Sequence, residues 1–151
     1  MDFTLNEEQE ALRAAARQFA RGEMTEVAEQ TEREAQPLAR DWVRRYAEMG
    51  FLGVNIPTCY GGLGLGNVEA LLVLEEFAKI SSAVAFPIFE SVVGPVRAIE
   101  HFADEGLKNR VIPAVCRGEM MVAVAMSEPE AGTALTDLRT KAEIRRNQLV
   151  I

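Results

Sequence analysis

Residues 121–126 read Met-Val-Ala-Val-Ala-Met, and this short stretch decides the fold class because the hydrophobic pattern changes there. Before Gly118 the apolar residues recur with the spacing of amphipathic helices. The run itself has the length and continuous apolar character of a buried strand, and a turn rich in proline and glycine follows it. The pattern predicts an α+β chain. An N-terminal all-α helical bundle, residues 1–118, is followed by the first strands of a truncated β-domain, residues 119–151.

Glycine, proline and capping residues divide the helical part into segments. Asn6 with Gln9 three residues later is typical of a capped helix start, and Gly22 is expected to interrupt that first helix. Asn67 and Asp104 are expected to cap later helices. The predicted helical segments after the first are residues 23–36, 37–49, 68–79, 82–102 and 104–118.

The loop at residues 50–67 and the segment at residues 82–102 are not expected to be simple continuous helices. Glycines and Pro57 within residues 50–67 predict a long ordered loop, with residues 52–56 as an extended crossing. The segment 82–102 contains Pro87 and Pro95, one of which is expected to kink or divide it.

The C-terminal part is expected to be β. Residues 138–144 and the apolar residues 149–151 flank Arg145-Arg146-Asn147, as in two strands and their turn. The sequence stops on Leu149-Val150-Ile151, an apolar strand whose partner would be missing. We therefore expect the chain to end in mid-element.

Composition excludes several classes of protein. The 151 residues are 48% hydrophobic and 26% charged, as in a globular protein, and the net charge of −7 would repel a nucleic acid backbone. Cys59, Cys116 and the single histidine, His101, do not have the spacing of a metal site or a disulfide framework. The acidic opening, residues 2–8, is unlike a secretory signal, and we expect no membrane span. These features predict a cytoplasmic protein with no metal.

The segment Ala125-Met-Ser-Glu-Pro-Glu-Ala-Gly-Thr133 is the best candidate for a ligand site. Ser127 and Thr133 offer hydroxyl donors, and Gly132 allows a close backbone approach that a β-carbon would block. Hydroxyls and free amides suit a phosphate or a ring carbonyl. The alternative is that residues 129–132 form only a surface turn.

Other polar or glycine-rich features carry weaker signals. Residues 60–66, Tyr-Gly-Gly-Leu-Gly-Leu-Gly, lack the strand and helix context of a phosphate loop and predict left-handed turns that fold the loop onto the helices. Glu75 and Glu76 are expected on a solvated helix face. His101 is expected to compensate a helix dipole or lie at the edge of the core.

Several motifs together resemble the acyl-CoA dehydrogenase family, over nearly the whole chain. They are the opening Leu5-Asn-Glu-Glu-Gln9, then Gly50-Phe-Leu-Gly-Val54, Ile56-Pro57 leading to Tyr60-Gly-Gly-Leu-Gly-Leu65, and Leu74-Glu-Glu-Phe-Ala78. The most specific is the segment 125–133, which resembles the signature at the start of that family's β-domain. The chain departs from the family pattern at Ala134, where Asp is usual, and at Asp137, where a small residue is usual.

The resemblance implies an FAD-dependent enzyme that oxidises the α,β-bond of an acyl-CoA thioester. It places FAD against Val124, Met126, Ser127, Gly132 and Thr133, with the Ser127 hydroxyl at the pyrimidine edge of the flavin and Gly132-Thr133 at the pyrophosphate. Thr133 also faces the acyl-CoA. The resemblance assigns no catalytic residue here, because the glutamate base is expected in a C-terminal region.

The resemblance also implies partners. These are acyl-CoA, an electron-transferring flavoprotein and copies of the same chain, as a tetramer when full length. We expect these 151 residues alone to be inactive. One alternative is a non-catalytic chain that completes a flavin site with another subunit, and another is a helical interaction module without a ligand.

Overall fold

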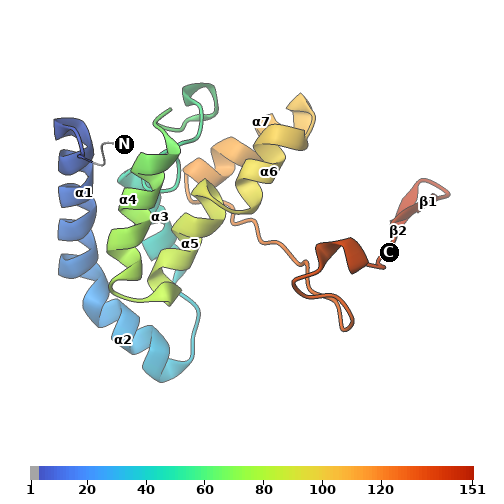
Figure 1. The fold of residues 1–151 in the computed structure, drawn as a ribbon, viewed down its shortest axis with the longest axis horizontal. Coiled ribbons are helices and arrows are strands. Elements are labelled where there is room, and N and C mark those ends of the chain that lie inside the picture. Colours follow the sequence, from blue (N-terminus) through green and yellow to red (C-terminus); the bar gives the residue numbers. More distant parts are fainter. Residues whose placement is uncertain (1–3) are drawn as a thin grey trace.

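The computed structural model describes residues 4–151, so the first residues of the acidic opening lie outside the described part. Seven α-helices and two short strands follow one another along these residues (Figure 1). The predicted α+β class is confirmed, with the helices first and the strands last. The elements are α1 (Glu7–Phe19), η1 (Ala20–Met24), α2 (Thr25–Glu34), α3 (Arg40–Glu48), η2 (Thr58–Tyr60), α4 (Asn67–Ala78), α5 (Ser82–Val92), α6 (Pro95–Phe102), α7 (Glu105–Cys116), η3 (Leu135–Asp137), β1 (Glu143–Arg145) and β2 (Gln148–Val150).

The first helix begins at the predicted capping box. The Asn6 side chain accepts from the Gln9 amide at 2.8 Å, and the Gln9 side chain accepts from the Asn6 amide at 3.1 Å. Gly22 interrupts the regular α-helix, as expected, without ending the run of helical residues. It lies in the π-helical turn η1, through which α1 continues directly into α2, because a π turn absorbs the irregularity without breaking the chain of helical residues.

An aromatic cluster forms the centre of the core. Phe77 of α4 contacts Tyr46 of α3 and Phe51, with ring centroids 5.0 and 5.3 Å apart, and Phe19 of α1 packs on all three. The Tyr46 hydroxyl donates to the Val84 carbonyl at 3.1 Å, and burial raises the pKa of Tyr46. These contacts join α1, α3, α4 and α5 into one packed unit.

The loop between α3 and α4 is ordered, as predicted. Residues 52–56 are buried but form successive turns instead of the expected extended crossing. Gly61 and Gly64 adopt left-handed conformations, and the amides of Leu63 and Leu65 donate back to Gly53 and Val54. The predicted left-handed turns are therefore confirmed, and they hold the loop against itself.

Two expectations for α4 are wrong. Its N-cap is Gly66 and not Asn67, whose side chain instead accepts from Asn55 at 2.8 Å. Glu76 is 2% exposed, because it lies one helical turn from buried Val73 and faces α1. Arg17 of α1 forms two hydrogen bonds with the Glu76 carboxylate, at 2.9 and 3.0 Å.

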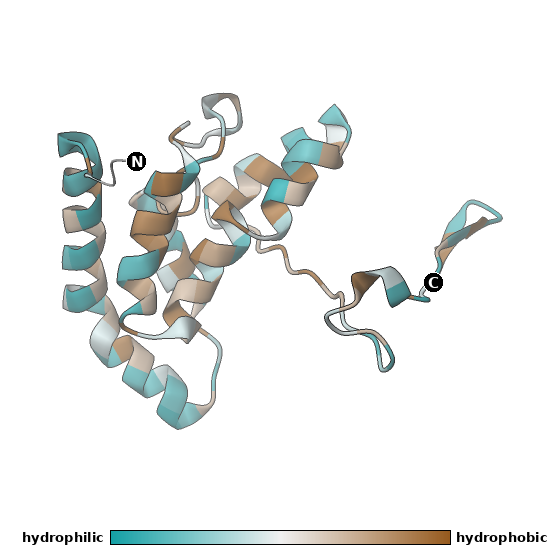
Figure 2. Ribbon diagram, viewed as in Figure 1, coloured by the Kyte–Doolittle hydropathy of each residue, from teal (hydrophilic) through white to brown (hydrophobic). Residues whose placement is uncertain are grey.

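The predicted segment 82–102 is divided at Gly94, and Pro95 begins α6. No membrane span was expected, yet by length and composition alone this stretch could cross a membrane. In the structure it is two helices, of which α5 packs on α4 and α6 packs on α7. Apolar colours predominate along α5 in Figure 2, and the helix has both buried apolar residues, such as Val84 and Ile88, and exposed ones, Phe86 and Phe89.

The expected strand at 121–126 is absent from the described structure. This segment leaves α7 as an extended, mostly exposed chain (Figure 1), because no other strand among residues 4–151 lies beside it to accept its hydrogen bonds. The predicted strands near the end are present but short, as an antiparallel hairpin of β1 and β2 with Arg146 and Asn147 in left-handed conformations at its turn. The domain boundary at residue 118 stays a prediction.

Candidate functional site

The candidate ligand segment folds into a tight turn at residues 128–131. The amide of Glu128 donates to the Ala131 carbonyl at 2.9 Å, and the amide of Ala131 donates back at 3.1 Å. Pro129 and Glu130 occupy the tip, and Ala131 is buried. Ser127 and Gly132 therefore stand on either side of the same turn.

The Glu128 carboxylate organises this turn. Its two oxygens accept from the backbone amides of Arg139 and Thr140 at 2.8 and 2.9 Å. The Thr140 side chain, together with these backbone amides, holds the pKa of Glu128 below its usual range through hydrogen bonds to the carboxylate. The role of Glu128 was not predicted from the sequence, since a contact between positions eleven and twelve residues apart leaves no periodic signal.

The five predicted flavin-binding residues all lie on this exposed segment. Val124 is 54% and Met126 48% exposed, and Ser127, Gly132 and Thr133 are exposed as well. These residues, which are close together in the sequence, therefore lie on one exposed segment away from the helices (Figure 1). Their roles in binding stay predictions.

The donors of the turn have no acceptors within the described part of the chain. The hydroxyls of Ser127 and Thr133 and the backbone amides of Ser127, Gly132 and Thr133 form no hydrogen bond there. A β-carbon at Gly132 would meet no atom within 4 Å, so the packing of the chain itself does not require a glycine. This donor set fits the carbonyls of a flavin ring and a pyrophosphate.

A second feature is the exposed face of α5, which was not predicted from the sequence. Phe86 and Phe89 lie with ring centroids 5.5 Å apart and are 55% and 37% exposed. Phe86 borders a mostly apolar groove of about 620 Å³ that also contains Leu38, Pro87 and Met121. Met121 belongs to the segment that leads to the turn, so the groove and the turn are joined by a few residues.

Comparison with known proteins identifies the family. Residues 6–119 match the family model described as the N-terminal domain of acyl-CoA dehydrogenase. The chain belongs to the acyl-CoA dehydrogenase family. The resemblance seen in the sequence motifs is therefore confirmed, and the α1–α7 bundle is this family's N-terminal domain.

Relatives of the acyl-CoA dehydrogenase family match almost the whole chain. Acryloyl-CoA reductase (NADH) of Anaerotignum propionicum is 35% identical over 94% of the chain, and mitochondrial isovaleryl-CoA dehydrogenase of Bos taurus is 32% identical over 97%. The solved complex of glutaryl-coenzyme A dehydrogenase with glutaryl-CoA is 30% identical, with a TM-score of 0.89 over 99% of the chain and 38% of that protein. The chain spans about a third of the length of these two curated relatives: 36% of the acryloyl-CoA reductase and 35% of the isovaleryl-CoA dehydrogenase.

Proposed function

We propose that the protein carrying this chain is an FAD-dependent enzyme that dehydrogenates the α,β-bond of an acyl-CoA thioester. The observation that carries the proposal is the family match over residues 6–119, directly followed by the exposed donor turn. Each of the three relatives acts on or binds a CoA thioester by its name. The names also include a reductase, so the direction of the reaction is part of the proposal.

In this proposal the chain supplies binding and orientation. The Ser127 hydroxyl donates to the pyrimidine edge of the flavin, and the Gly132 and Thr133 amides donate to the pyrophosphate. FAD, when bound, supplies the acceptor for the hydride that leaves the β-carbon. Thr133 also faces the acyl-CoA, and the exposed Phe86–Phe89 face offers an apolar surface to its acyl chain. We propose that the electrons then pass to an electron-transferring flavoprotein.

The test is an FAD titration of the purified whole protein that carries this chain, followed by anaerobic addition of butyryl-CoA or isovaleryl-CoA, with the 151 residues alone, which we expect to be inactive, as the comparison. We expect a stoichiometric flavin absorbance that bleaches when the thioester is added. Ser127→Ala and Thr133→Val should each weaken FAD binding about ten-fold, the effect of losing one good hydrogen bond. Thr136→Val, in the same region but outside the donor set, is the control and should leave binding unchanged. Equal affinity in all variants would contradict the assignment of the turn.

A second candidate function is that of a non-catalytic chain that completes a flavin site with another subunit. One observation favours it: Ile144 and Leu149 pair across the hairpin and are 82% and 67% exposed, so the hairpin presents an uncovered apolar surface. Co-expression with a C-terminal half of a family member tests this candidate. A defined complex of the two chains is expected, and recovery of separate species would exclude it.

A further inference from the structure

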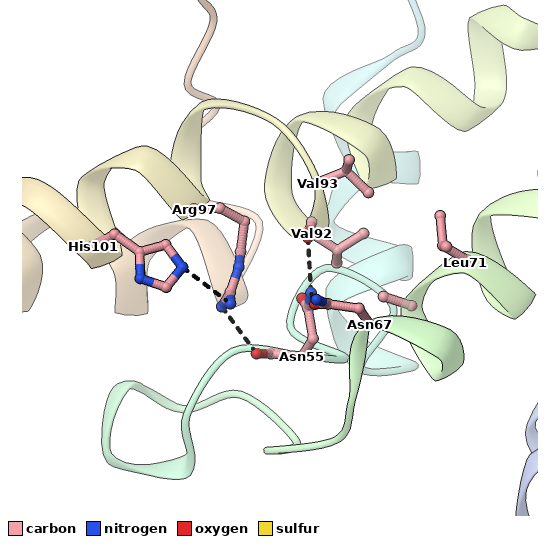
Figure 3. Close-up of a pocket in the computed structure, with 8 residues that line it drawn as sticks. Asn55, Asn67, Leu71, Val92, Val93, Arg97 and His101 are labelled. Atoms are coloured by element: carbon pink, nitrogen blue, oxygen red, sulfur yellow. Dashed lines mark hydrogen bonds between the residues drawn. The ribbon is translucent and has the colours of Figure 1, made fainter.

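A cavity of about 310 Å³ lies between α4, the junction of α5 with α6, and the loop that precedes α4 (Figure 3). Its volume is at the lower end of the range for small-molecule sites. None of its lining residues belongs to the turn at residues 127–133 or to the groove beside Phe86, so the cavity is separate from the proposed flavin site. The apolar side of the cavity is formed by Ala70, Leu71, Val92 and Val93.

The guanidinium at the cavity is already neutralised by a carboxylate. Arg97 of α6 donates to the Glu100 carboxylate and, through the same Nη1, to the Asn55 backbone carbonyl at 3.1 Å. Its Nη2 lies 3.4 Å from Nε2 of His101, one turn along α6 (Figure 3). An anionic ligand would have to compete with Glu100 for this guanidinium, and a cationic ligand would be repelled by it. The cavity therefore favours a neutral ligand.

Asn55 contributes a buried hydrogen-bond acceptor to the cavity wall. Asn55 is 7% exposed, and its Oδ1 has no hydrogen-bond partner in the described part of the chain. Its Nδ2 donates to the Asn67 side-chain oxygen at 2.8 Å and to the Val92 carbonyl at 2.9 Å. Because a carbonyl can only accept, the Asn55 nitrogen must face Val92, and the unpaired atom is the oxygen. Proteins pair nearly all buried polar atoms, so this oxygen calls for a donor from outside the chain.

Asn67 contributes a donor beside this acceptor. Its side-chain oxygen accepts the hydrogen bond from Asn55, and its Nδ2 has no acceptor within residues 4–151. The two amides thus share one hydrogen bond and leave an acceptor on Asn55 and a donor on Asn67. A primary carboxamide has an N–H donor and a carbonyl acceptor on the same carbon, so one such group can pair with both.

We propose that this cavity binds a neutral ligand that has a primary carboxamide on a short apolar chain. The ligand N–H donates to Asn55 Oδ1, and the ligand carbonyl accepts from Asn67 Nδ2. The hydrocarbon part packs on Leu71, Val92 and Val93. A carboxylate or a ketone lacks the N–H that the Asn55 oxygen requires, so neither group uses both partners.

The test uses butyramide as the probe on the whole 151-residue chain. His101 lines the cavity and is the only histidine, so its ring protons report binding in a proton NMR titration without assignment. We expect these signals to shift saturably with butyramide, and calorimetry measures the affinity in parallel. 2-Pentanone has the same shape and carbonyl but a methyl group in place of the NH₂ group. It should bind about ten-fold more weakly, because it leaves the Asn55 oxygen unpaired, and butyrate should bind no more tightly than 2-pentanone.

Three variants on α4 test whether butyramide binds in this cavity. Leu71→Trp places a large ring at the apolar side and should abolish binding, whereas Val68→Trp, at an equally exposed position that does not line the cavity, should leave it unchanged. Asn67→Ala, also at an exposed position, removes the second hydrogen bond and should weaken butyramide binding about ten-fold. Equal affinity for butyramide and 2-pentanone, or butyramide binding that survives Leu71→Trp or is undiminished in Asn67→Ala, would overturn the proposal.

Discussion

At the scale of single residues, Glu76 shows how an ionisable group can belong to the core. Its carboxylate is 1% exposed and lies 2.9 Å from Arg17 and 3.0 Å from Lys79. The Arg17 guanidinium, helped by Lys79, lowers the pKa of Glu76 to about 2 despite the opposing effect of burial. The lowered pKa means that the folded state favours the charged form.

This pKa shift makes stability depend on pH. A carboxyl group with a depressed folded pKa contributes its stability above the unfolded pKa of about 4.3, and that contribution disappears as the pH falls toward about 2. Glu76→Gln should therefore cost about 3 kcal/mol of unfolding free energy at neutral pH and little at pH 2. Urea unfolding at several pH values measures this. The matched control is Glu75→Gln, whose side chain is 59% exposed and pairs with Lys79, and it should change stability by less than about 0.5 kcal/mol. Equal losses in the two variants would contradict the buried ion pair.

The sequence could have indicated Glu76, because it lies four and three residues after buried Leu72 and Val73, on the same helix face. The pattern alone could not show that Arg17, fifty-nine residues earlier, faces it. The turn at residues 127–133 illustrates the same limit. Its donors were predicted from residue types, but the carboxylate of Glu128 that ties it to residues 139 and 140 was not.

At the scale of elements, helices were more predictable than strands: the terminal hairpin is present, but the strand expected at 121–126 is not. A helix pairs its backbone within itself, so spacing and caps such as Asn6 or Asp104 suffice to place its ends. A strand needs a neighbour, and residues 121–126 have none in the described part of the chain, whatever their hydrophobicity. The loop at 50–67 was predicted as ordered, but its turns depend on close contacts that glycine spacing does not specify.

Substitutions at two glycines test where a close contact in the fold requires the absence of a β-carbon. A β-carbon at Gly62 would lie 2.1 Å from the Ile56 carbonyl oxygen, whereas one at Gly22 would meet nothing within 4 Å. Gly62→Ala should thus destabilise the protein by about 2 kcal/mol or more. Gly22→Ala, in the π turn between α1 and α2, should stabilise it by about 0.5–1 kcal/mol by restricting the unfolded chain. Thermal unfolding of both variants measures the two signs, and a stabilised Gly62→Ala protein would refute the close approach.

At the scale of the whole molecule, the helices and the C-terminal part differ in how they are held together. The aromatic cluster packs α1, α3, α4 and α5, while most residues from 120 onward are exposed. The helical unit therefore has a core of its own, and the segment that carries the predicted flavin residues draws little stability from it. Because the hydrogen-bond donors of this segment are unpaired, we expect the segment to become ordered chiefly when a ligand binds to it.

Amide hydrogen exchange of the whole chain tests that description. Within residues 4–151 no acceptor pairs with the amides of residues 121–127, so they should exchange close to intrinsic rates, whereas the buried amides of α4 should exchange only through global unfolding. Saturating FAD should then slow exchange at Ser127, Gly132 and Thr133, because their amides acquire acceptors. Strong protection of residues 121–127 without FAD would show that this segment pairs with a strand after all. Unchanged exchange at Gly132 and Thr133 with FAD would instead remove the turn from the flavin site, while leaving the family membership of the helical unit intact.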